Sequence, residues 1–425
     1  MQRIHFRLYK IKEVQSRVVI TGLGVTAPNG VGVAAFNEAI KKGVSGIRFY
    51  KELEALNFSC CVGGIPPVPE ALKQQYLSPL QLKNFNSNGI LYGCMAGMDA
   101  WKDAGLSINE NSEPDWDSGT VFGTGSSSVE KLRESFYKID AGHVKTLGST
   151  AVSQTMASGI SAYISGILGL GNLVTTNSSA CCTGTEAIIT GFERIQSGKA
   201  KRMLVGGCSD DGPYLWGGFD AMKVITYKHN NTPEKASRPM SATASGFVPG
   251  SGAGALLLES LTSATERGQR GTGSMTAPNN EAVQRCIKSA VENAGINADE
   301  IDLINGHLTA TIKDAAEINN WSVALNRKGN NFPYIHSLKA MTGHCLGAAG
   351  AIESVAGVLG LYHGFIFPSI NCEDIHPDIA SIIGEEKIPQ QLIKTDTLQV
   401  IAKASFGFGD INSCIIFKKY NGKEL

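Results

Sequence analysis

The sequence predicts an α/β protein made of two similar halves, each with a sheet covered by helices. Three observations support this prediction. Short apolar, β-branched runs alternate with helical stretches along the 425 residues, the runs are continuously hydrophobic, and they form two series. Continuously hydrophobic strands are typical of sheets whose two faces are both covered. A segment in which charge and glycine density rise together, residues 259–273, separates the two series.

Nine apolar runs are the expected strands. The first series comprises residues 17–21, 119–122, 172–176, 202–205 and 255–258. The second series comprises residues 302–305, 334–337, 399–402 and 414–417. We therefore divide the chain into an N-terminal extension, a first half and a second half, at residues 1–16, 17–258 and 259–425.

A glycine-rich turn, residues 22–30, follows the first expected strand. Its third glycine comes too late for a dinucleotide-binding fingerprint, and Pro28 stands where the helix of that motif would begin. A tight exit from the strand is the favoured interpretation.

The charge balance argues against several classes of protein. Lys and Arg number 38 and Asp and Glu number 38, which gives a formal net charge of zero. Because proteins that neutralise phosphates normally carry a basic excess, we expect no nucleic-acid partner. No apolar run approaches the length of about 18 residues that a membrane span needs, and the N-terminus lacks the apolar core of a signal peptide. We expect a soluble, cytoplasmic protein with no membrane span.

One of the ten cysteines stands apart from the others. Most lie inside apolar runs without a repeated Cys-x-x-Cys pattern, so we expect reduced, buried thiols and no zinc site. Cys181, however, comes where an expected strand runs through small residues into an expected helix. The N–H groups at a helix N-terminus stabilise a thiolate, so we expect a lowered pKa and a nucleophile. A small buried thiol in a strand–helix corner is the alternative interpretation.

Two histidines of the second half follow expected strands at turns that contain glycine, a place where α/β folds present functional side chains. His307 ends one strand and is followed by alternating threonines, Thr309 and Thr311. His344 follows a second strand directly after Gly343. Both are candidate site residues.

A carboxylate is expected in the core close to the second histidine. The stretch after His344 is almost wholly small and apolar, so Glu353 within it should be buried. A buried carboxylate needs a cationic partner, and Lys339, just before this helix, is the expected one.

Together these motifs resemble the β-ketoacyl-acyl-carrier-protein synthases, the elongating type I and II condensing enzymes of the thiolase superfamily. The resemblance covers nearly the whole chain. It rests on an ordered series of motifs, namely Ala-Cys-x-x-Gly at Cys181, His-x-Thr-x-Thr at His307, Lys-x-Met-x-Gly-His ending at His344, and Gly-Phe-Gly around Phe408. It implies a thiolase-like fold, with two similar α/β halves in a layered α-β-α-β-α arrangement.

The resemblance also implies an activity, that of a 3-oxoacyl-[acyl-carrier-protein] synthase. Cys181 would accept an acyl chain from the phosphopantetheine arm of an acyl carrier protein, and His307 and His344 would polarise a malonyl thioester as it loses carbon dioxide. Lys339, paired with Glu353, would orient the histidines. The backbone N–H groups of Cys181 and Phe408 would bind the oxyanion.

Further roles follow from the same resemblance. Phe408 would be a gate to the acyl tunnel, and Thr309 and Thr311 would bind the pantetheine arm. Some relatives bind a monovalent cation at positions that correspond here to Asn305, Glu353 and Asn412, and Lys403 stands near enough to replace such an ion. The resemblance implies no permanently bound cofactor or metal, an acyl-carrier-protein partner and a homodimer.

The sequence departs from the family pattern in four places. Leu308 replaces a glycine, and the segment from His307 to Asp314 is one residue short. Asp410 replaces a glycine next to the gate and is expected to stiffen it. Ser126 would widen the acyl pocket, which favours long or polyene chains. About twenty residues are missing between residues 268 and 273, from which we expect a break in the chain near residues 269–272.

Two other functions stay open. The chain could be a non-catalytic partner similar to a chain-length factor, although such partners lack the nucleophile that Cys181 supplies. It could also be a thiolase-type acyltransferase that depends on coenzyme A, although the cysteine expected near the C-terminus of such enzymes is matched only by Cys414, inside an expected strand.

Overall fold

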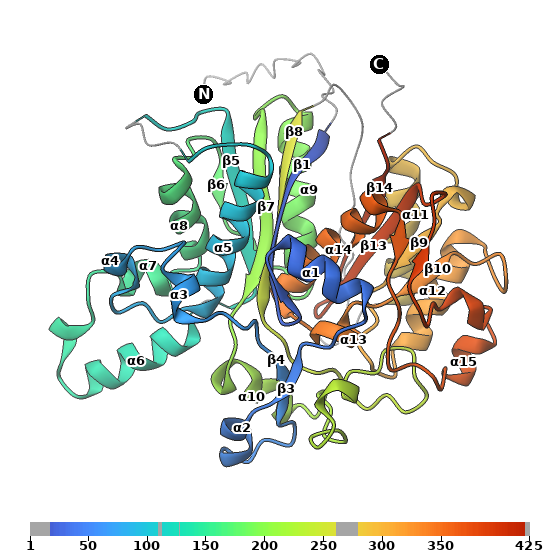
Figure 1. The fold of residues 1–425 in the computed structure, drawn as a ribbon, viewed down its shortest axis with the longest axis horizontal. Coiled ribbons are helices and arrows are strands. Elements are labelled where there is room, and N and C mark those ends of the chain that lie inside the picture. The colour runs from blue at the N-terminus through green and yellow to red at the C-terminus, as the bar shows by residue number, and fades with distance from the viewer. Residues whose placement is uncertain (1–17, 109–112, 127, 261–278, 421–425) are drawn as a thin grey trace, which may run out of the picture.

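The computed structural model describes residues 18–108, 113–126, 128–260 and 279–420. They form two main sheets, a six-stranded one of order β2-β1-β8-β7-β5-β6 and a four-stranded one of order β10-β9-β13-β14 (Figure 1). The expected extension at residues 1–16 and the expected break near residues 269–272 lie outside the described residues.

All nine expected strands are present. The strands of the first sheet are β1 (Val18–Ala27), β2 (Gly30–Val31), β5 (Ser118–Thr124), β6 (Val174–Thr175), β7 (Arg202–Ser209) and β8 (Gly252–Ser260). Those of the second sheet are β9 (Leu303–Asn305), β10 (Tyr334–His336), β13 (Val400–Gly407) and β14 (Ile411–Lys418). Two short hairpin-like pairs that the sequence did not predict are β3 (Ile47–Phe49) with β4 (Val62–Gly64), and β11 (Phe365–Ile366) with β12 (Ile393–Lys394).

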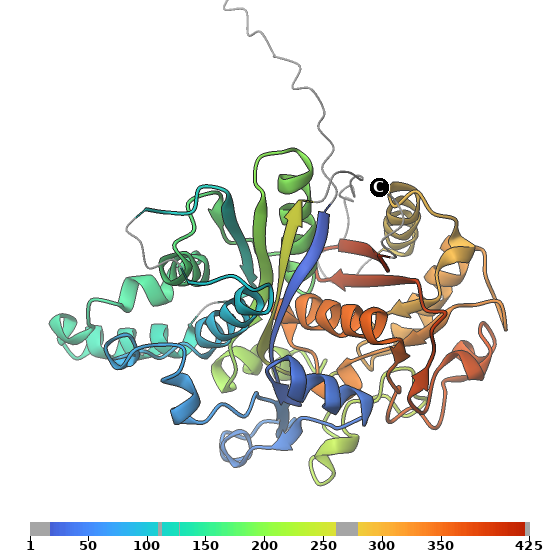
Figure 2. The ribbon, with the colours of Figure 1, turned by 45° about the horizontal axis from the view of Figure 1, so that its top comes forward.

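The helices complete five layers, the arrangement that the sequence predicted (Figures 1 and 2). Two helices cover the outer face of the first sheet, α5 (Asn88–Asp103) and α8 (Gly159–Leu168). Two lie between the sheets and contact both, α9 (Thr183–Gln196) and α14 (Ala349–His363). Two lie beside the second sheet, α11 (Asn280–Asn293) and α12 (Asp314–Leu325).

The remaining helices lie around this layered core. They are α1 (Val33–Lys41), α2 (Lys51–Ala55), α3 (Glu70–Lys73), α4 (Pro79–Leu82), α6 (Val129–Asp140), α7 (Ala151–Thr155), α10 (Pro213–Ala221), α13 (Lys339–Thr342) and α15 (Pro377–Ala380). In the part of the chain that the structure describes, no helix has the length and apolarity to cross a bilayer.

The two central helices approach each other closely because small residues face one another. A Cβ atom at Gly184 of α9 would stand 2.7 Å from the backbone nitrogen of Ala351 in α14, closer than side chains are found in proteins. Glycine therefore permits a contact that any other residue would force apart. The result is that the start of α9 and the start of α14 lie side by side.

This packing brings segments from both halves of the sequence to one place. Strand β9 leads into the loop with His307, and α13, which begins at Lys339, leads to His344. The turn between β13 and β14, residues 407–411, closes over the start of α9. Strand β8 crosses the proposed division after residue 258 and ends at Ser260, and all strands of the second sheet follow it; the division stays a prediction.

Candidate active site

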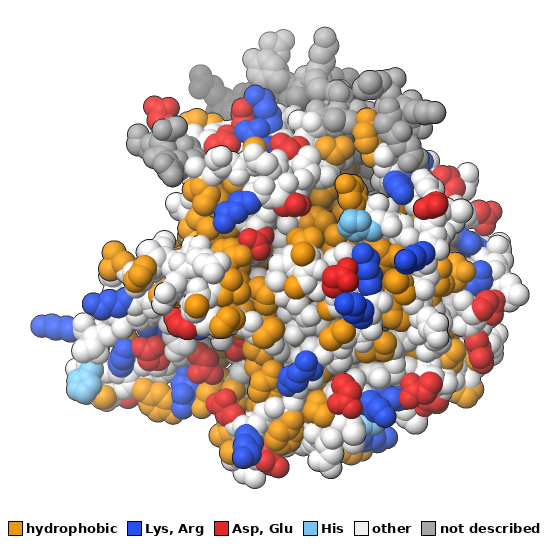
Figure 3. Space-filling model, in the orientation of Figure 1, with side chains coloured by type: hydrophobic (Ala, Val, Ile, Leu, Met, Phe, Trp, Pro, Cys, Tyr) orange, Lys and Arg blue, Asp and Glu red, His pale blue; other side chains and the backbone are white. Residues whose placement is uncertain are grey.

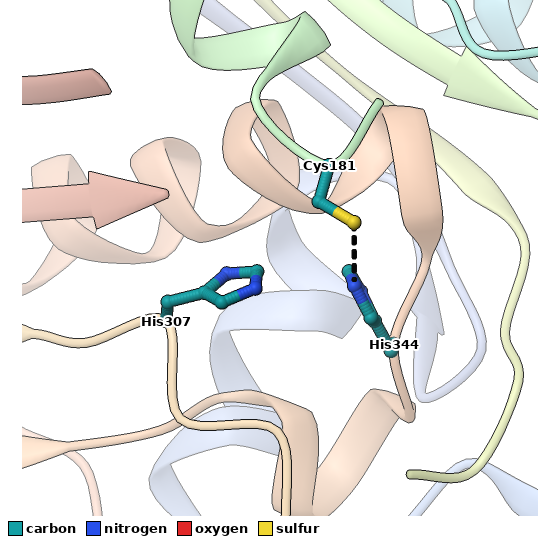
Figure 4. A group of neighbouring side chains, drawn as sticks. All are labelled: Cys181, His307 and His344. Carbon is teal, nitrogen blue, oxygen red and sulfur yellow. Dashed lines mark hydrogen bonds between the residues drawn. The ribbon is translucent and has the colours of Figure 1, made fainter. Parts of the chain in front are cut away.

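Cys181 lies in a tight turn immediately before α9. Ala180 has a φ of 47°, an uncommon conformation for a residue with a side chain. The hydroxyl of Thr183 holds this turn, since its Oγ1 donates to the carbonyl of Ala180 at 2.7 Å and accepts the Ser179 N–H at 2.8 Å. The turn directs the Cys181 thiol away from the helix and toward the two histidines (Figure 4).

The three expected catalytic side chains meet. His344 Nε2 is 3.1 Å from Cys181 Sγ, and the rings of His307 and His344 lie edge to face with centroids 5.3 Å apart. One sulfur or nitrogen atom from each of the three residues lies within 4.8 Å of those of the other two. Residues 163 positions apart along the chain thus form one cluster.

The pKa of the Cys181 thiol is raised, whereas the sequence analysis expected a lowered pKa. Burial raises the pKa of Cys181 to about 11, against the opposing effects of Lys339 and of the backbone N–H groups of Cys181 and Phe408. A rise of this size corresponds to about 3 kcal/mol, whereas a helix N-terminus typically contributes about 0.3–1 kcal/mol. Burial therefore outweighs the helix, and the resting thiol is protonated, although the residue as a whole keeps partial exposure.

Both histidines are held neutral. Burial lowers the pKa of His307 and of His344 well below 6.5, and the positive charge of Lys339 lowers both further. Aromatic rings fix their orientation, with Phe247 edge-on to His344 at 5.4 Å and Phe406 against His307 at 6.2 Å. Neutral imidazoles in fixed positions are suited to donating a hydrogen bond from one ring nitrogen.

Two buried carboxylates that the sequence analysis did not single out hold the His307 loop. Glu317 accepts the N–H groups of His307 at 2.7 Å and Leu308 at 2.8 Å. Asp314 accepts the N–H group of Thr309 at 2.9 Å, and also contacts those of the next two residues. The available signal was their spacing, because acids three apart at the start of a helix lie on one face.

These carboxylates explain how the loop tolerates its departure from the family pattern. Leu308 has a φ of 20°, a strained value for a residue with a side chain. Its side chain is fully buried in the core of the second half, and Glu317 bonds its backbone N–H. Core packing and the hydrogen bond together offset the strain of replacing glycine.

Lys339 pairs with Glu353, as the sequence predicted, and both side chains are only 2% exposed. The other carboxylate oxygen of Glu353 is 2.8 Å from the ammonium of Lys403, whose side chain is 1% exposed. Glu353 therefore bridges two buried ammonium groups. Breaking a buried ion pair of this kind typically costs about 3–5 kcal/mol, so the cluster fixes α14 relative to its neighbours.

The expected gate residue, Phe408, stands in the β13–β14 turn and is 37% exposed. Its backbone N–H and that of Cys181 both act to lower the pKa of the Cys181 thiol. These are the two donors that the resemblance assigns to the oxyanion. They converge on the atom to which an acyl carbonyl would be attached.

Two residues anchor that turn. The buried thiol of Cys182 contacts the carbonyls of Ser405 at 3.1 Å and Ile411 at 3.0 Å, one on each strand. The buried carboxylate of Asp410 accepts the Asn279 N–H at 2.7 Å, which ties the turn to the start of α11. The side chain at position 410 thus holds the turn down, in line with the expected stiffening.

The other expected binding residues are placed as follows. Thr309 and Thr311 are half-buried and their hydroxyls lie 3.1 Å apart. Thr311 also lines a small hollow together with Met240, Ser241 and His376. The expected cation ligands Asn305 and Asn412 both use their side-chain N–H groups, since Asn412 donates to Asp410 and Asn305 donates to the Glu353 carbonyl at 2.9 Å. Their Oδ1 atoms are buried and have no hydrogen-bond partner among the described residues.

Among the described residues, one group of three has metal-ligand atoms in reach of one another, and it is Cys181, His307 and His344. A thiolate and two imidazoles form a donor set that zinc prefers. Such an ion would occupy the sulfur, so it would compete with any chemistry at the thiol.

Comparison with known proteins matches this fold and site to one family. The family described as "Beta-ketoacyl synthase, N-terminal domain" matches residues 15–264, and "Beta-ketoacyl synthase, C-terminal domain" matches residues 259–373. The 3-oxoacyl-[acyl-carrier-protein] synthase 1 of Haemophilus influenzae is 34% identical over 96% of this chain and all of that protein. The enzyme of the same name from Escherichia coli is 33% identical over 95% of this chain and 99% of that protein.

Solved structures agree with the sequence comparison. A structure titled "The ishigamide ketosynthase/chain length factor" superposes with a TM-score of 0.84 at 25% identity, over 96% of this chain and all of that one. A type II PKS acyl-carrier protein in complex with its ketosynthase superposes with a TM-score of 0.83 at 27% identity, over the same shares. The fold and the Cys-His-His cluster therefore define a ketosynthase with a thiolase-like fold. The chain belongs to the β-ketoacyl synthase family.

Proposed function

We propose that this protein is a 3-oxoacyl-[acyl-carrier-protein] synthase that lengthens an acyl chain by two carbons in fatty acid or polyene biosynthesis. The observation that carries the proposal is the convergence of Cys181, His307 and His344 in a chain that is 33–34% identical to enzymes of that name. The reaction is a decarboxylative condensation between an acyl group on Cys181 and a malonyl group on a carrier protein.

In the first half-reaction the acyl group moves to Cys181. The protonated thiol loses its proton to His344 Nε2, 3.1 Å away, as sulfur attacks the thioester carbonyl of the acyl carrier. The C–S bond to the pantetheine arm breaks, and the leaving thiolate takes up the proton. The backbone N–H groups of Cys181 and Phe408 stabilise the oxyanion, since they point at the sulfur to which that carbonyl is bound.

In the second half-reaction a malonyl thioester enters. Once Cys181 is acylated, the neutral ring of His344 carries its proton on Nε2 instead of Nδ1. His307 and His344 then donate hydrogen bonds to the thioester oxygen of the malonyl group as the bond to the carboxylate breaks and carbon dioxide leaves. The electron pair of that bond forms the new carbon–carbon bond to the acyl carbonyl on Cys181. The C–S bond to Cys181 then breaks, its sulfur takes up a proton from water, and a 3-oxoacyl thioester remains on the carrier.

Other residues position these groups. Lys339 orients the histidines through its buried pair with Glu353 and helps to keep them neutral. Thr309 and Thr311, beside the hollow at Thr311, hydrogen-bond the pantetheine arm. Phe408 moves to open the acyl tunnel, and glycines on both sides of it allow the movement.

The proposal includes two protein partners and a location. A carrier protein delivers both substrates, and the similar ketosynthase bound to its acyl-carrier protein supports this. The face shown in Figure 3 carries interspersed acidic and basic side chains, so docking depends on local groups and not on one large basic field. A homodimer is also proposed, because β6 is the outermost strand of the first sheet and its Val174 is 39% exposed. We propose that the protein acts in the cytoplasm.

The site disfavours the alternative functions. A chain-length-factor-like partner needs no nucleophile, yet here the thiol has its histidines and two N–H donors in place. A coenzyme-A-dependent thiolase would need a second reactive cysteine, and burial raises the pKa of Cys414 in β14 to about 12. The proposed substrates include both saturated and polyene acyl chains. Ser126, which is half-buried, favours a wider acyl pocket and therefore the polyene chains.

The test of the proposal is a condensation assay with purified protein, an acyl carrier and malonyl carrier labelled in its free carboxylate. We expect labelled carbon dioxide and a 3-oxoacyl carrier in equal amounts, and neither from Cys181→Ser. Chain preference is measured with saturated and polyenoyl carriers in the same assay. Folded protein that forms no product with any primer would favour the non-catalytic partner, and activity with coenzyme A thioesters alone would favour the thiolase type.

A further inference from the structure

A second buried ammonium lies beside the catalytic cluster, and the proposed mechanism does not use it. Lys403 stands in the middle of β13 with its side chain 1% exposed. An ammonium has three N–H donors and no acceptor. Three oxygens surround that of Lys403, namely Glu353 Oε2 at 2.8 Å, Ser405 Oγ at 3.1 Å and the Ala404 carbonyl.

This arrangement does not fit a bound monovalent cation at Glu353. Two ammonium groups, from Lys339 and Lys403, already share the single negative charge of Glu353. A further cation would meet two like charges in a poorly solvated place. The amide N–H of Asn412, an expected ligand, donates to Asp410, and its Oδ1 is buried with no hydrogen-bond partner among the described residues.

Lys403 nevertheless stands next to residues that were expected to bind a cation. Asn305 is its direct neighbour in the parallel pairing of β9 and β13, and the amide of Asn305 donates to the Glu353 carbonyl at 2.9 Å. Asn305 Oδ1 is buried and has no hydrogen-bond partner among the described residues. The Lys403 ammonium thus contacts oxygen atoms of α14 and β13, and its neighbour on β9, Asn305, has an unpartnered buried oxygen.

We propose that the Lys403 ammonium takes the place of a monovalent cation, so that this protein needs no sodium, potassium or ammonium ion. Lys403 is a positioning residue. It binds Glu353 on the helix that follows His344, and Ser405 on the strand that leads to Phe408. Ser405 Oγ in turn lies 2.9 Å from Thr185 Oγ1 on the helix that follows Cys181.

The inference predicts what removal of this side chain does. Lys403→Ser leaves Glu353 Oε2, Ser405 Oγ and the Ala404 carbonyl around a space that a cation can enter. Lys403→Met fills the same space with an apolar chain and offers no cation site. Lys394→Ser, at an exposed lysine of β12, is the matched control.

The experiment measures the melting temperature of each variant in potassium, sodium and choline chloride at equal ionic strength. We expect wild type and Lys394→Ser to melt at the same temperature in all three salts. Lys403→Ser should melt lower in choline chloride and recover by about 2–4 °C or more in potassium or sodium chloride, and Lys403→Met should not recover. The comparison of wild type in the three salts needs no variant. A dependence of its melting temperature on the cation would therefore be detected even where a variant does not fold.

A melting temperature of wild type that rises in potassium or sodium chloride relative to choline chloride would overturn the inference. So would a folded Lys403→Ser that no cation stabilises. The catalytic part of the inference rests on the proposed function, and condensation is therefore assayed in the same salts. We expect the kcat of Lys403→Ser, and not that of wild type, to depend on the cation. Inactive wild type with the expected melting temperatures would contradict the proposed function but not the cation replacement.

Discussion

His344 Nε2 lies 3.1 Å from Cys181 Sγ, within hydrogen-bonding distance of the thiol. Burial raises the pKa of Cys181 to about 11 and lowers the pKa of His344 well below 6.5. The resting pair is therefore a neutral thiol and a neutral imidazole, and not a thiolate with an imidazolium. Proton transfer accompanies attack on the substrate instead of preceding it.

The first prediction concerns the pH dependence of alkylation at Cys181. Only the thiolate reacts, so the rate of reaction with iodoacetamide should rise about tenfold for each pH unit between pH 7 and 10. Peptide mass spectrometry at each pH gives the rate for this residue. A plateau below pH 8 would mean that the helix N-terminus dominates after all.

The second prediction separates Cys182 from its neighbour. Its thiol contacts the carbonyls of Ser405 and Ile411 in the core, so Cys182→Ala should lower the free energy of unfolding by about 1–2 kcal/mol. Cys182→Ser keeps a donor and should lose less. Denaturant unfolding measures both, and both variants should still accept an acyl group at Cys181. Loss of acylation in a fully stable Cys182→Ala would assign this thiol a chemical role.

The third prediction concerns the β13–β14 turn. Asp410→Gly removes the carboxylate that accepts the Asn279 N–H, and glycine readily adopts the φ of 58° found there. We expect amide hydrogen exchange in residues 407–411 to become severalfold faster. Asp410→Asn is the matched control, because asparagine tolerates this conformation and keeps an acceptor oxygen. Equal exchange in wild type and both variants would show that the carboxylate does not hold the turn.

The fourth prediction concerns stability in acid. Burial lowers the pKa of His336 to about 3, whereas the unfolded chain has the ordinary value of 6.5. Between these values only the unfolded chain binds the proton, so the stability contribution is complete above pH 6.5 and is lost as the pH falls toward 3. His336→Phe, which keeps a ring stacked on Phe367, should remove this dependence.

Urea unfolding of wild type and His336→Phe at pH 7.5 and pH 5 measures the effect. From pH 7.5 to pH 5, the free energy of unfolding of wild type should fall by about 2 kcal/mol more than that of the variant. The reason is that pH 5 lies 1.5 units below 6.5, the pKa of the histidine in the unfolded chain. A constant difference between the two proteins would mean that His336 accepts a proton in the folded state.

The fold and the catalytic cluster could be predicted because they depend on local patterns. Apolar runs predicted the nine strands, and the motifs around Cys181, His307 and His344 each indicated a functional side chain at the end of a strand or the start of a helix. The pair of Lys339 with Glu353 followed from one charge in an apolar helix. That Cys181, His307 and His344 lie together, and that the layers follow the order α-β-α-β-α, was implied by the family resemblance and not by these local patterns.

The features that the sequence did not predict depend on contacts between distant segments. The pKa of Cys181 is set by how much protein surrounds it, which no local pattern gives. Cys182 contacts a residue 229 positions away, and Asp410 contacts one 131 positions away. Glu317 could have been suspected from its spacing with Asp314, but its bonds to the His307 loop appear only in the fold.

The most direct test of the account is the intact mass of the protein after incubation with an acyl carrier. We predict a mass increase of one acyl group, located at Cys181 by peptide mapping, absent in Cys181→Ser and retained in Cys182→Ser. The increase should disappear when malonyl carrier is added, as the 3-oxoacyl product forms. Folded wild-type protein that stays unmodified with every acyl carrier tried, or that carries the acyl group at another residue, would contradict the account.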